Sequence, residues 1–328
     1  MKKYTRRKFF DKASKGSLFL LTPIFLKKSP GKSSSKPFDN SRVVIIEDPF
    51  VLDGSTIIQP RVQGMVADGI RSLTDITDVG EAWKSLFPGI TQNSVISIKV
   101  NCVNRYLPTH PEVAYSIVNG LTSMQVEGSP FPDNNIIIWD RSNSELSDSG
   151  YTINTGATGV RCFGTDEIGY ASQIYTVNGQ SQQLSRIIDQ SNYIINLAVF
   201  KGGTYAGVTL SMKNHYGSCN SPSTMHTSRC DPFLPALNAL PLIKNKQVIC
   251  ICDAIFGTAK YSVSSPQFTS KRMIFSTDPV AHDYIGAEIL QTEYNCDTVA
   301  KATHLATATQ APYNLGTNDP NQIDLVEI

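Results

Sequence analysis

The sequence predicts an α/β fold, with a mostly parallel sheet that has helices on both faces. Two patterns predict it. Short β-branched runs, which have the composition of buried strands, alternate along the chain with segments whose apolar residues recur at helical spacing. Strands that alternate with helices are typical of a parallel sheet. A third observation is a long polar segment, residues 202–229, rich in Gly, Ser and Asn, which we expect to be a functional loop.

Six segments are predicted to be strands of this sheet. Each is a short apolar run in which Val and Ile are frequent. In chain order they are Arg42–Glu47, Val95–Asn101, Asn135–Asp140, Tyr193–Phe200, Gln247–Asp253 and Arg272–Thr277.

The helices are predicted from their start signals and periodicity. One begins near Pro111, because proline is favoured in the first turn, and we expect His110 to belong to its N-terminus. Another follows Asp278-Pro279, with Asp278 as the N-cap. Less regular helical patterns cover residues 59–73, 184–190 and 233–243. We expect His304 to lie on the surface.

The net charge of +1 is divided unevenly along the chain. Residues 1–36 carry eleven Lys and Arg and one acid, which gives +10, whereas residues 37–328 carry eighteen Lys and Arg against twenty-seven acids, which gives −9. An acidic body argues against a general nucleic-acid-binding surface. With 41% hydrophobic and 17% charged residues the chain is neither disordered nor fibrous, and no apolar run approaches the ~20 residues that span a bilayer.

The basic leader, residues 1–28, has the features of an export signal. Thr5-Arg6-Arg7-Lys8-Phe9-Phe10 precedes a short apolar stretch, and the paired arginines resemble the twin-arginine (Tat) type. A basic amphipathic arm is the alternative. Residues 29–41 are expected to be a flexible linker and residues 42–328 the α/β domain. We therefore expect export through the Tat translocase, to the periplasm or to a membrane tether formed by an uncleaved signal.

The chain has seven cysteines, an odd number, so at least one is unpaired within it. There is no Cys-x-x-Cys motif, and we expect no intrinsic ferredoxin-type iron–sulfur cluster. Cys250 and Cys252 alternate with isoleucines in a predicted strand and are expected to be buried. Cys219 and Cys230 flank a polar segment and are candidates for a disulfide or a metal site.

Polar residues close or follow several predicted strands. Any one of them matches an ordinary strand end or helix cap, but five strand ends that share this feature favour a polar site along one rim, where open α/β sheets bind ligands. These residues are Lys99, Asn101, Asp140, Lys201, Asp253 and Asp278. Asp283 lies inside an otherwise apolar helix, so we expect it to face this rim or a basic residue such as Lys213.

The densest polar stretch runs from Lys201 to Cys230. Its glycines allow close backbone approach to a ligand, and Lys201 and Lys213 supply cations for a phosphate or carboxylate. It matches neither a Walker loop nor the GxGxxG fingerprint, so nucleotide binding is weakly supported. Thr209 and Asn214 complete the predicted ligand-binding set. The predicted catalytic candidates are Lys213, His226 and Asp253.

A possible metal site lies in the same stretch. His215, Cys219, His226 and Cys230 form the pattern H-x3-C-x6-H-x3-C, and four such ligands could hold zinc or iron tetrahedrally. The spacing differs from that of standard zinc fingers. The alternatives are loop histidines with buried or bridged cysteines, a single histidine ligand, or a catalytic His226.

In these residues the chain resembles the domain-of-unknown-function family 362. The resemblance runs from about residue 42 to about residue 290 and rests on the order and spacing of several blocks. They are Ile98-Lys99-Val100-Asn101, Thr109-His110-Pro111-Glu112, Trp139-Asp140-Arg141-Ser142 with Gly150-Tyr151, Asn196-Leu197 to Lys201, Gly207 to Asn214, His226, Asp253-Ala254-Ile255 and Ser276 to Asp283.

The resemblance implies an α/β fold with a site around Lys213-Asn214, but it supplies no established reaction. It also fits the Tat-like leader, because exported members exist. Many members have Lys-Thr-His where this chain has Lys201-Gly202-Gly203, so one histidine is missing, and His215 is a candidate to replace it. Some members carry an additional iron–sulfur ferredoxin segment, which this chain lacks.

Together these features predict an exported α/β protein with a Lys/Asp/His site at the strand ends, which binds a small anionic substrate or a metal and acts as a redox or hydrolytic enzyme. In this hypothesis lysines neutralise the anion, carboxylates hold a cation or act as bases, and His226 transfers a proton or binds the metal. The alternative is a non-catalytic binding or maturation partner of an exported redox complex. A third hypothesis makes residues 215–230 a structural zinc or disulfide staple.

Overall fold

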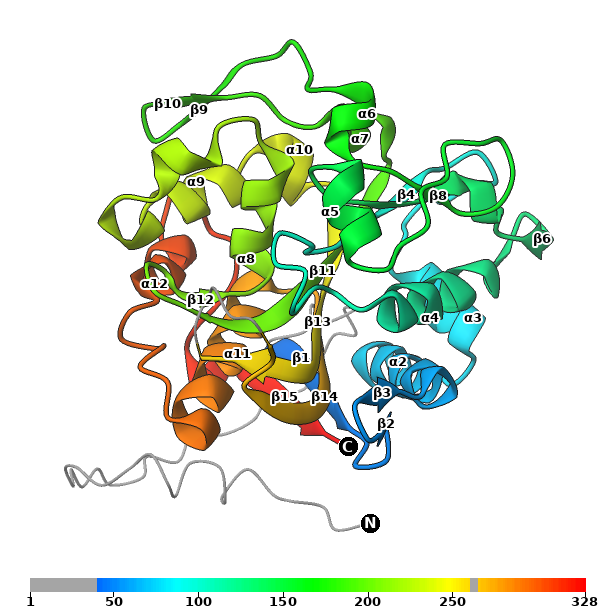
Figure 1. Cartoon of the computed structure of the whole chain (residues 1–328), viewed down its shortest axis with the longest axis horizontal. Helices are drawn as coiled ribbons and strands as arrows, with labels where there is room; N and C mark the ends of the chain where they lie inside the picture. The colour runs from blue at the N-terminus through cyan, green and yellow to red at the C-terminus, as the bar shows by residue number, and fades with distance from the viewer. Residues whose placement is uncertain (1–39, 260–264) are drawn as a thin grey trace, which may run out of the picture.

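The computed structural model describes residues 40–259 and 265–328 (Figure 1). The predicted signal segment and nearly all of the predicted linker lie outside these residues. Nine strands form one sheet in the order β15-β1-β14-β13-β11-β4-β7-β8, with β12 paired to β11. Their bounds are β1 Ser41–Glu47, β4 Ile96–Lys99, β7 Ile136–Trp139, β8 Arg161–Cys162, β11 Tyr193–Gly203, β12 Gly207–Thr209, β13 Gln247–Thr258, β14 Phe268–Ser276 and β15 Ile323–Glu327.

The sheet is mostly parallel, as the sequence predicts. β13, β11, β4, β7 and β8 are successive parallel neighbours, and β1 pairs in parallel with β15. Two strands run the other way: β14 is antiparallel to both β1 and β13, and β12 is antiparallel to β11. All six predicted strands form. Three two-stranded hairpins lie apart from the sheet, namely β2 Leu52–Asp53 with β3 Thr56–Ile57, β5 Gln125–Val126 with β6 Ser129–Pro130, and β9 Tyr175–Val177 with β10 Gln180–Gln182.

Helices cover both faces of the sheet (Figure 1). In β1, Val44 and Ile46 join the apolar core that contains residues of α2, α3 and α4, whereas the alternate residues Val43 and Ile45 join the core that contains residues of α11 and α12. Because successive side chains of a strand point to opposite faces, these two cores lie on opposite sides of the sheet. The helices are α2 Gln59–Thr74, α3 Val79–Ser85, α4 Pro111–Thr122, α5 Asn143–Asp148, α6 Thr165–Ile168, α7 Arg186–Gln190, α8 Ser211–Asn214, α9 Phe233–Asn238, α10 Pro241–Lys244, α11 Pro279–Tyr294 and α12 Thr303–Thr309.

Local chemistry explains the helix boundaries. Asp278 caps α11, since its side chain accepts hydrogen bonds from the backbone N–H groups of Val280 and Ala281, as predicted. The pattern predicted over 233–243 forms two short helices, because Pro241 has no N–H to donate and holds Leu240 in an extended conformation. The prediction that His304 lies on the surface is wrong, because its side chain is fully buried.

The polar segment 202–229 is folded rather than open. It continues β11 into a tight hairpin with β12 and then forms α8 and the 3₁₀ turns η2 His215–Ser218 and η3 Pro222–Met225, with η4 Ser228–Cys230 at its end. Most of its first half is buried. The segment therefore serves as a wall of the domain.

The strand order creates a topological switch point between β4 and β11. From β4 the chain proceeds to β7 on one side, and from β11 it proceeds to β13 on the other. Ligands of open α/β sheets bind at the carboxyl ends of the strands where this change of direction occurs. Within the described residues, no helix is long and apolar enough to cross a membrane.

Candidate functional site

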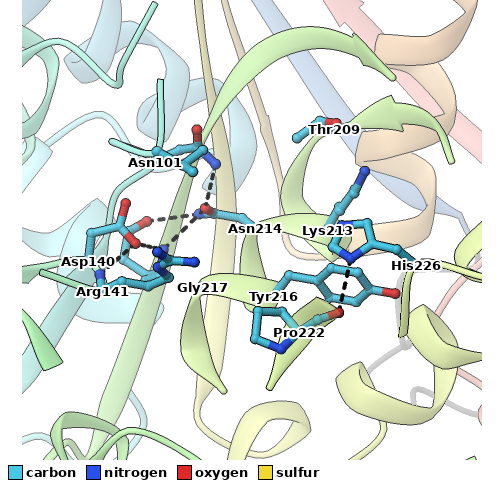
Figure 2. Close-up of a pocket in the computed structure, with 12 residues that line it drawn as sticks. Asn101, Asp140, Arg141, Thr209, Lys213, Asn214, Tyr216, Gly217, Pro222 and His226 are labelled. Carbon is cyan, nitrogen blue, oxygen red and sulfur yellow. Dashed lines mark hydrogen bonds and ion pairs between the residues drawn. The ribbon is translucent and has the colours of Figure 1, made fainter. Parts of the chain in front are cut away.

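A small pocket lies at this switch point (Figure 2). Its cavity volume is about 80 Å³. A water molecule takes about 30 Å³ in the liquid, so the cavity admits a group of a few heavy atoms and not a nucleotide. The twelve lining residues are Lys99, Asn101, Val103, Asp140, Arg141, Thr209, Lys213, Asn214, Tyr216, Gly217, Pro222 and His226.

A buried ion pair forms one wall of the pocket. Lys99, at the end of β4, places Nζ 2.7 Å from Oδ1 of Asp140, which directly follows β7. Asp140 also accepts hydrogen bonds from the backbone N–H groups of Cys102 and Arg141, at 2.6 and 2.9 Å. With three donors around it, the carboxylate is already occupied by the protein.

Asn214 joins α8 to the strands beneath it. Its Oδ1 accepts from Asn101 Nδ2 at 3.2 Å and from Lys99 Nζ at 3.3 Å, and its Nδ2 donates to Asn196 Oδ1 at 2.8 Å. Asn101 in turn accepts from Lys201 Nζ at 3.0 Å. This network holds α8, β4 and β11 in one arrangement, and it is the reason why the predicted residues of these three elements meet.

Asp283 anchors the start of α8 from behind. Its carboxylate accepts hydrogen bonds from the backbone N–H groups of Ser211 and Met212 at 2.8 and 2.9 Å, and from the Ser211 hydroxyl at 2.6 Å. It is also 2.8 Å from His282 Nδ1. Asp283 is fully buried and does not line the pocket, so the expectation that it faces the rim or Lys213 is wrong. Backbone N–H groups at the start of a helix have no partner within the helix, and those of α8 donate to the Asp283 carboxylate instead.

Two polar side chains of the folded loop are buried in the opposite wall. Lys213 of α8 is 7% exposed, and burial lowers the pKa of its ammonium group. Thr209, at the end of β12, is 4% exposed, and its hydroxyl has no hydrogen-bond partner among residues 40–259 and 265–328. A buried hydroxyl without a partner costs free energy that a bound acceptor would recover.

His226 lies beside Lys213 at the rim of the pocket (Figure 2). Its Nδ1 is 3.0 Å from the carbonyl oxygen of Pro222, and because a carbonyl only accepts, Nδ1 carries the hydrogen. Burial and the Lys213 charge lower the pKa of His226. The ring is therefore neutral at pH 7, with the lone pair on Nε2, as a general base requires.

A second pair of titratable groups lies behind the pocket. Asp253 of β13 is fully buried, and its Oδ2 is 2.6 Å from His110 Nδ1 and 2.9 Å from the His110 backbone nitrogen. His110 occupies the N-cap position of α4, as predicted, but its side chain does not cap the helix. Burial opposes protonation, yet the attraction and hydrogen bond of Asp253 prevail and raise the pKa of His110. Asp253 does not line the pocket.

Lys201 lies between the pocket and the His110–Asp253 pair. It is fully buried within β11, and burial lowers its pKa to about 8 although Asp140 and Asp253 act in the opposite direction. It reaches the pocket only through its hydrogen bond to Asn101. Lys201 is therefore placed to hold Asn101 rather than to contact a ligand in the pocket directly.

Asp278 does not belong to this rim. Because β14 runs antiparallel to its neighbours, its carboxyl end lies at the opposite edge of the sheet from those of β4, β7 and β11. There Asp278 caps α11, accepts from Ser41 Oγ at 2.5 Å and lines a separate cavity of about 710 Å³ with Arg42. The prediction that Asp278 belongs to the rim of strand ends is therefore wrong.

The predicted tetrahedral metal site does not form. No three His, Cys, Asp or Glu side chains among residues 40–259 and 265–328 come together in a way that could hold a metal ion. His215 is fully buried, with Nδ1 2.9 Å from Ser218 Oγ and Nε2 2.8 Å from Gln247 Oε1, so both ring nitrogens are engaged. Cys219 donates to the Tyr216 carbonyl.

The seven cysteines are free and buried, which also corrects the predicted Cys219–Cys230 disulfide. Of these cysteines, Cys102 is the closest in sequence to Lys99 of the ion pair, and it lies next to the pocket. Burial and the neighbouring Asp140 charge raise the pKa of Cys102 well above its usual value. It is therefore a protonated thiol at neutral pH and not an activated nucleophile.

Three lining residues that matter to the geometry are absent from the predicted set of site residues: Arg141, Tyr216 and Gly217. A Cβ atom on Gly217 would lie 2.8 Å from Lys99 Nζ and 2.9 Å from Asp140 Oδ1, so only glycine lets this backbone approach the ion pair. Arg141 directly follows Asp140 and pairs with Glu145 at 3.2 Å. Its position next to a predicted site residue was the available signal, whereas the role of Gly217 depends on tertiary contacts.

The lining is rich in donors and cations. Among the described residues that form it, three are Lys or Arg and the sole carboxylate is Asp140, which the protein already neutralises. A family model described as "Domain of unknown function (DUF362)" matches residues 96–288, a range that contains every lining residue of the pocket. No curated protein matches the chain.

Proposed function

The chain belongs to the DUF362 family, and on that premise we propose that its pocket at the β4–β11 switch point binds a small anion. One observation carries the proposal: in an acidic domain, a cavity sized for a few heavy atoms is lined by Lys213 and Arg141, and its one carboxylate, Asp140, is paired with Lys99. Buried cations bind phosphate, sulfate or carboxylate groups through charge-assisted hydrogen bonds.

The Thr209 hydroxyl supports an anion rather than a metal ion as the ligand. It is a buried donor without a partner at the pocket wall, and an anionic oxygen would accept its hydrogen. A metal ion would need several carboxylate, thiolate or imidazole ligands, and the pocket lining offers one occupied carboxylate and one histidine.

The test is isothermal titration calorimetry of the full chain with orthophosphate, sulfate and acetate. We expect at least one of them to bind, and Lys213→Met to weaken that binding by about tenfold or more, because it removes a buried cation. Lys84→Met is the matched control, since Lys84 lies on α3 outside the pocket and its substitution changes the net charge equally. The proposal fails if no anion binds or if both variants bind like the parent chain.

A hydrolytic reaction on the bound anion is a second candidate, favoured by the Nδ1–H tautomer of His226 at the pocket rim. In a phosphate monoester, water would attack phosphorus while His226 Nε2 takes one of its protons, the phosphorus–oxygen ester bond would break, and the protonated ring would pass that proton to the leaving alcohol oxygen. Release of orthophosphate from monoesters by the parent chain but not by His226→Gln would support this reaction. Equal release by both would overturn it.

We also propose that the protein is exported through the Tat route, on the strength of its leader sequence. Fractionation of cells that produce the full chain should place it outside the cytoplasm. Replacing Arg6 and Arg7 by lysine keeps the leader charge but removes the paired arginines, and it should retain the protein in the cytoplasm. An unchanged distribution would contradict the proposal.

A further inference from the structure

Three aromatic rings lead from the pocket wall to the surface. The Tyr216 and His226 ring centroids are 5.0 Å apart with an interplanar angle of 79°, and the His226 and Tyr205 centroids are 6.3 Å apart at 72°. We call these three residues the aromatic row. Tyr216 is 6% exposed and lines the pocket, whereas Tyr205, in the turn between β11 and β12, is 58% exposed.

The row is fixed at its inner end. The Tyr216 hydroxyl donates to the Met225 carbonyl at 2.7 Å, and His226 Nδ1 donates to Pro222, so both rings are tied to the same short segment. Both also line the pocket. The exposed face of Tyr205 is therefore continuous, through edge-to-face ring contacts, with the wall of the anion pocket.

One exposed apolar side chain lines the pocket itself. Val103 lines it and is 40% exposed, although most of the large apolar side chains of the domain are buried. An apolar residue that stands alone on a surface needs no explanation, but Val103 and the aromatic row adjoin a cavity whose other lining residues are mostly polar.

The size of the cavity then limits what these residues can contact. About 80 Å³ holds an oxyanion group and little more. Any further part of the ligand must lie outside the cavity, where Val103 is exposed and where the exposed Tyr205 ring adjoins the lining residue His226. An aromatic ring of the ligand there would bind more tightly, because it would bury apolar surface of Val103 and Tyr205 and make edge-to-face or stacked contacts with the Tyr205 ring.

We propose that the ligand is an organic anion with an apolar, aromatic body: its oxyanion head fills the pocket and its ring lies outside against Tyr205. This inference rests on the proposed anion site and adds the chemical class of the molecule that occupies it. Inorganic anions are then partial ligands, which occupy the head position alone.

Phosphonates provide the test, because their carbon–phosphorus bond is not cleaved by ester hydrolysis. Methylphosphonate and phenylphosphonate present the same head group and differ in the body. Calorimetry with the full chain should show phenylphosphonate binding about tenfold more tightly than methylphosphonate. Tyr205→Ala should remove this preference and leave the affinity for methylphosphonate unchanged, whereas Tyr205→Phe should keep it.

Phe50→Ala serves as the control, since Phe50 is an exposed aromatic residue that does not line the pocket, and it should behave like the parent chain. Equal affinities for the two phosphonates in the parent chain would overturn the inference while leaving the anion site intact, as would a preference that survives Tyr205→Ala. Acetate and benzoate repeat the comparison with a carboxylate head. If no phosphonate, no carboxylate and neither orthophosphate nor sulfate binds the parent chain, it is the anion site itself that fails.

Discussion

Lys99 Nζ lies 2.7 Å from Asp140 Oδ1, and the two side chains are 1% and 4% exposed. The pair joins the carboxyl ends of two neighbouring parallel strands, β4 and β7, at one wall of the pocket. Removing both charges from water is costly, and the cost is offset only because each group has further hydrogen bonds. Either charge without its partner would therefore be strongly unfavourable.

The first prediction is that Asp140→Asn destabilises the domain by about 3–5 kcal/mol, because it leaves the Lys99 ammonium buried without a counter-charge. Urea denaturation of the variant and the parent chain measures the difference in unfolding free energy. Glu81→Gln is the control, since it breaks the exposed Lys84–Glu81 pair and should cost less than about 1 kcal/mol. Similar losses in the two variants would contradict the role assigned to burial.

The second prediction concerns Gly217, whose missing side chain makes room for the ion pair. Gly217→Ala should cost about 1–3 kcal/mol of unfolding free energy, because the new methyl group would meet Lys99 and Asp140 at about 2.8–2.9 Å. It should also weaken anion binding, since both contacted groups line the pocket.

Gly64 provides the opposite result within the same chain. It lies on the exposed side of α2, with no atom within 4 Å of an added Cβ. Gly64→Ala should leave stability unchanged or raise it by up to about 1 kcal/mol, because alanine has the higher helix propensity. If Gly217→Ala changed the unfolding free energy as little as Gly64→Ala, this would contradict the close packing of Gly217 against the ion pair.

The parts of the site that the sequence predicts are those fixed by parallel strands. Lys99 ends β4, Asn101 and Asp140 follow β4 and β7, and the carboxyl ends of parallel neighbours meet at one edge. Asp278 was predicted by the same reasoning and lies at the other edge, because β14 is antiparallel. The local composition of a strand does not encode its direction, so strand-end reasoning fails wherever a sheet is mixed.

Other contacts of the site depend on distant parts of the chain. His110 and Asp253 are 143 residues apart in sequence, and they meet because the start of α4 lies against β13. Asp283 was expected to face the rim or a basic residue, but the N-terminus of α8 supplies two backbone donors. The metal pattern at 215–230 failed for a related reason: Gln247, far along the chain, engages the ring of His215.

The third prediction is a pH-dependent contribution from the His110–Asp253 pair. The pKa of His110 is raised above the usual 6.5 in the folded state, so the folded protein holds this proton more tightly than the unfolded chain. The stabilisation is fully present below pH 6.5 and is lost as the pH rises through the folded pKa. Asp253→Asn removes the attraction, so its deficit in unfolding free energy should be largest near pH 5.5 and shrink toward alkaline pH.

Urea denaturation at several pH values measures this deficit, and NMR titration of the His110 ring should show its pKa falling in Asp253→Asn. Asp68→Asn is the control: Asp68 is exposed on α2 and pairs with Arg71, so its effect should be nearly independent of pH in this range. A deficit for Asp253→Asn that does not change with pH would show that the pair acts only through packing.

The fourth prediction separates binding from stability at Thr209. Its hydroxyl is buried without a partner, and a buried unsatisfied donor costs about 1–3 kcal/mol. Thr209→Val keeps the shape and removes the hydroxyl, so the ligand-free domain should become more stable or stay unchanged in thermal and urea unfolding. Anion binding should nevertheless weaken by about tenfold, because the donor that faces the ligand is gone.

Ser97 is the matched control for Thr209→Val, which we expect to keep or raise stability while it weakens anion binding. Its hydroxyl is also buried without a partner, in β4, but it does not line the pocket. Ser97→Ala should therefore be tolerated in the same way while anion affinity stays at the parent value. A Thr209→Val variant that binds anions normally would mean that the hydroxyl is only a packing defect. A variant that loses stability would mean that the hydroxyl already has a partner within the fold.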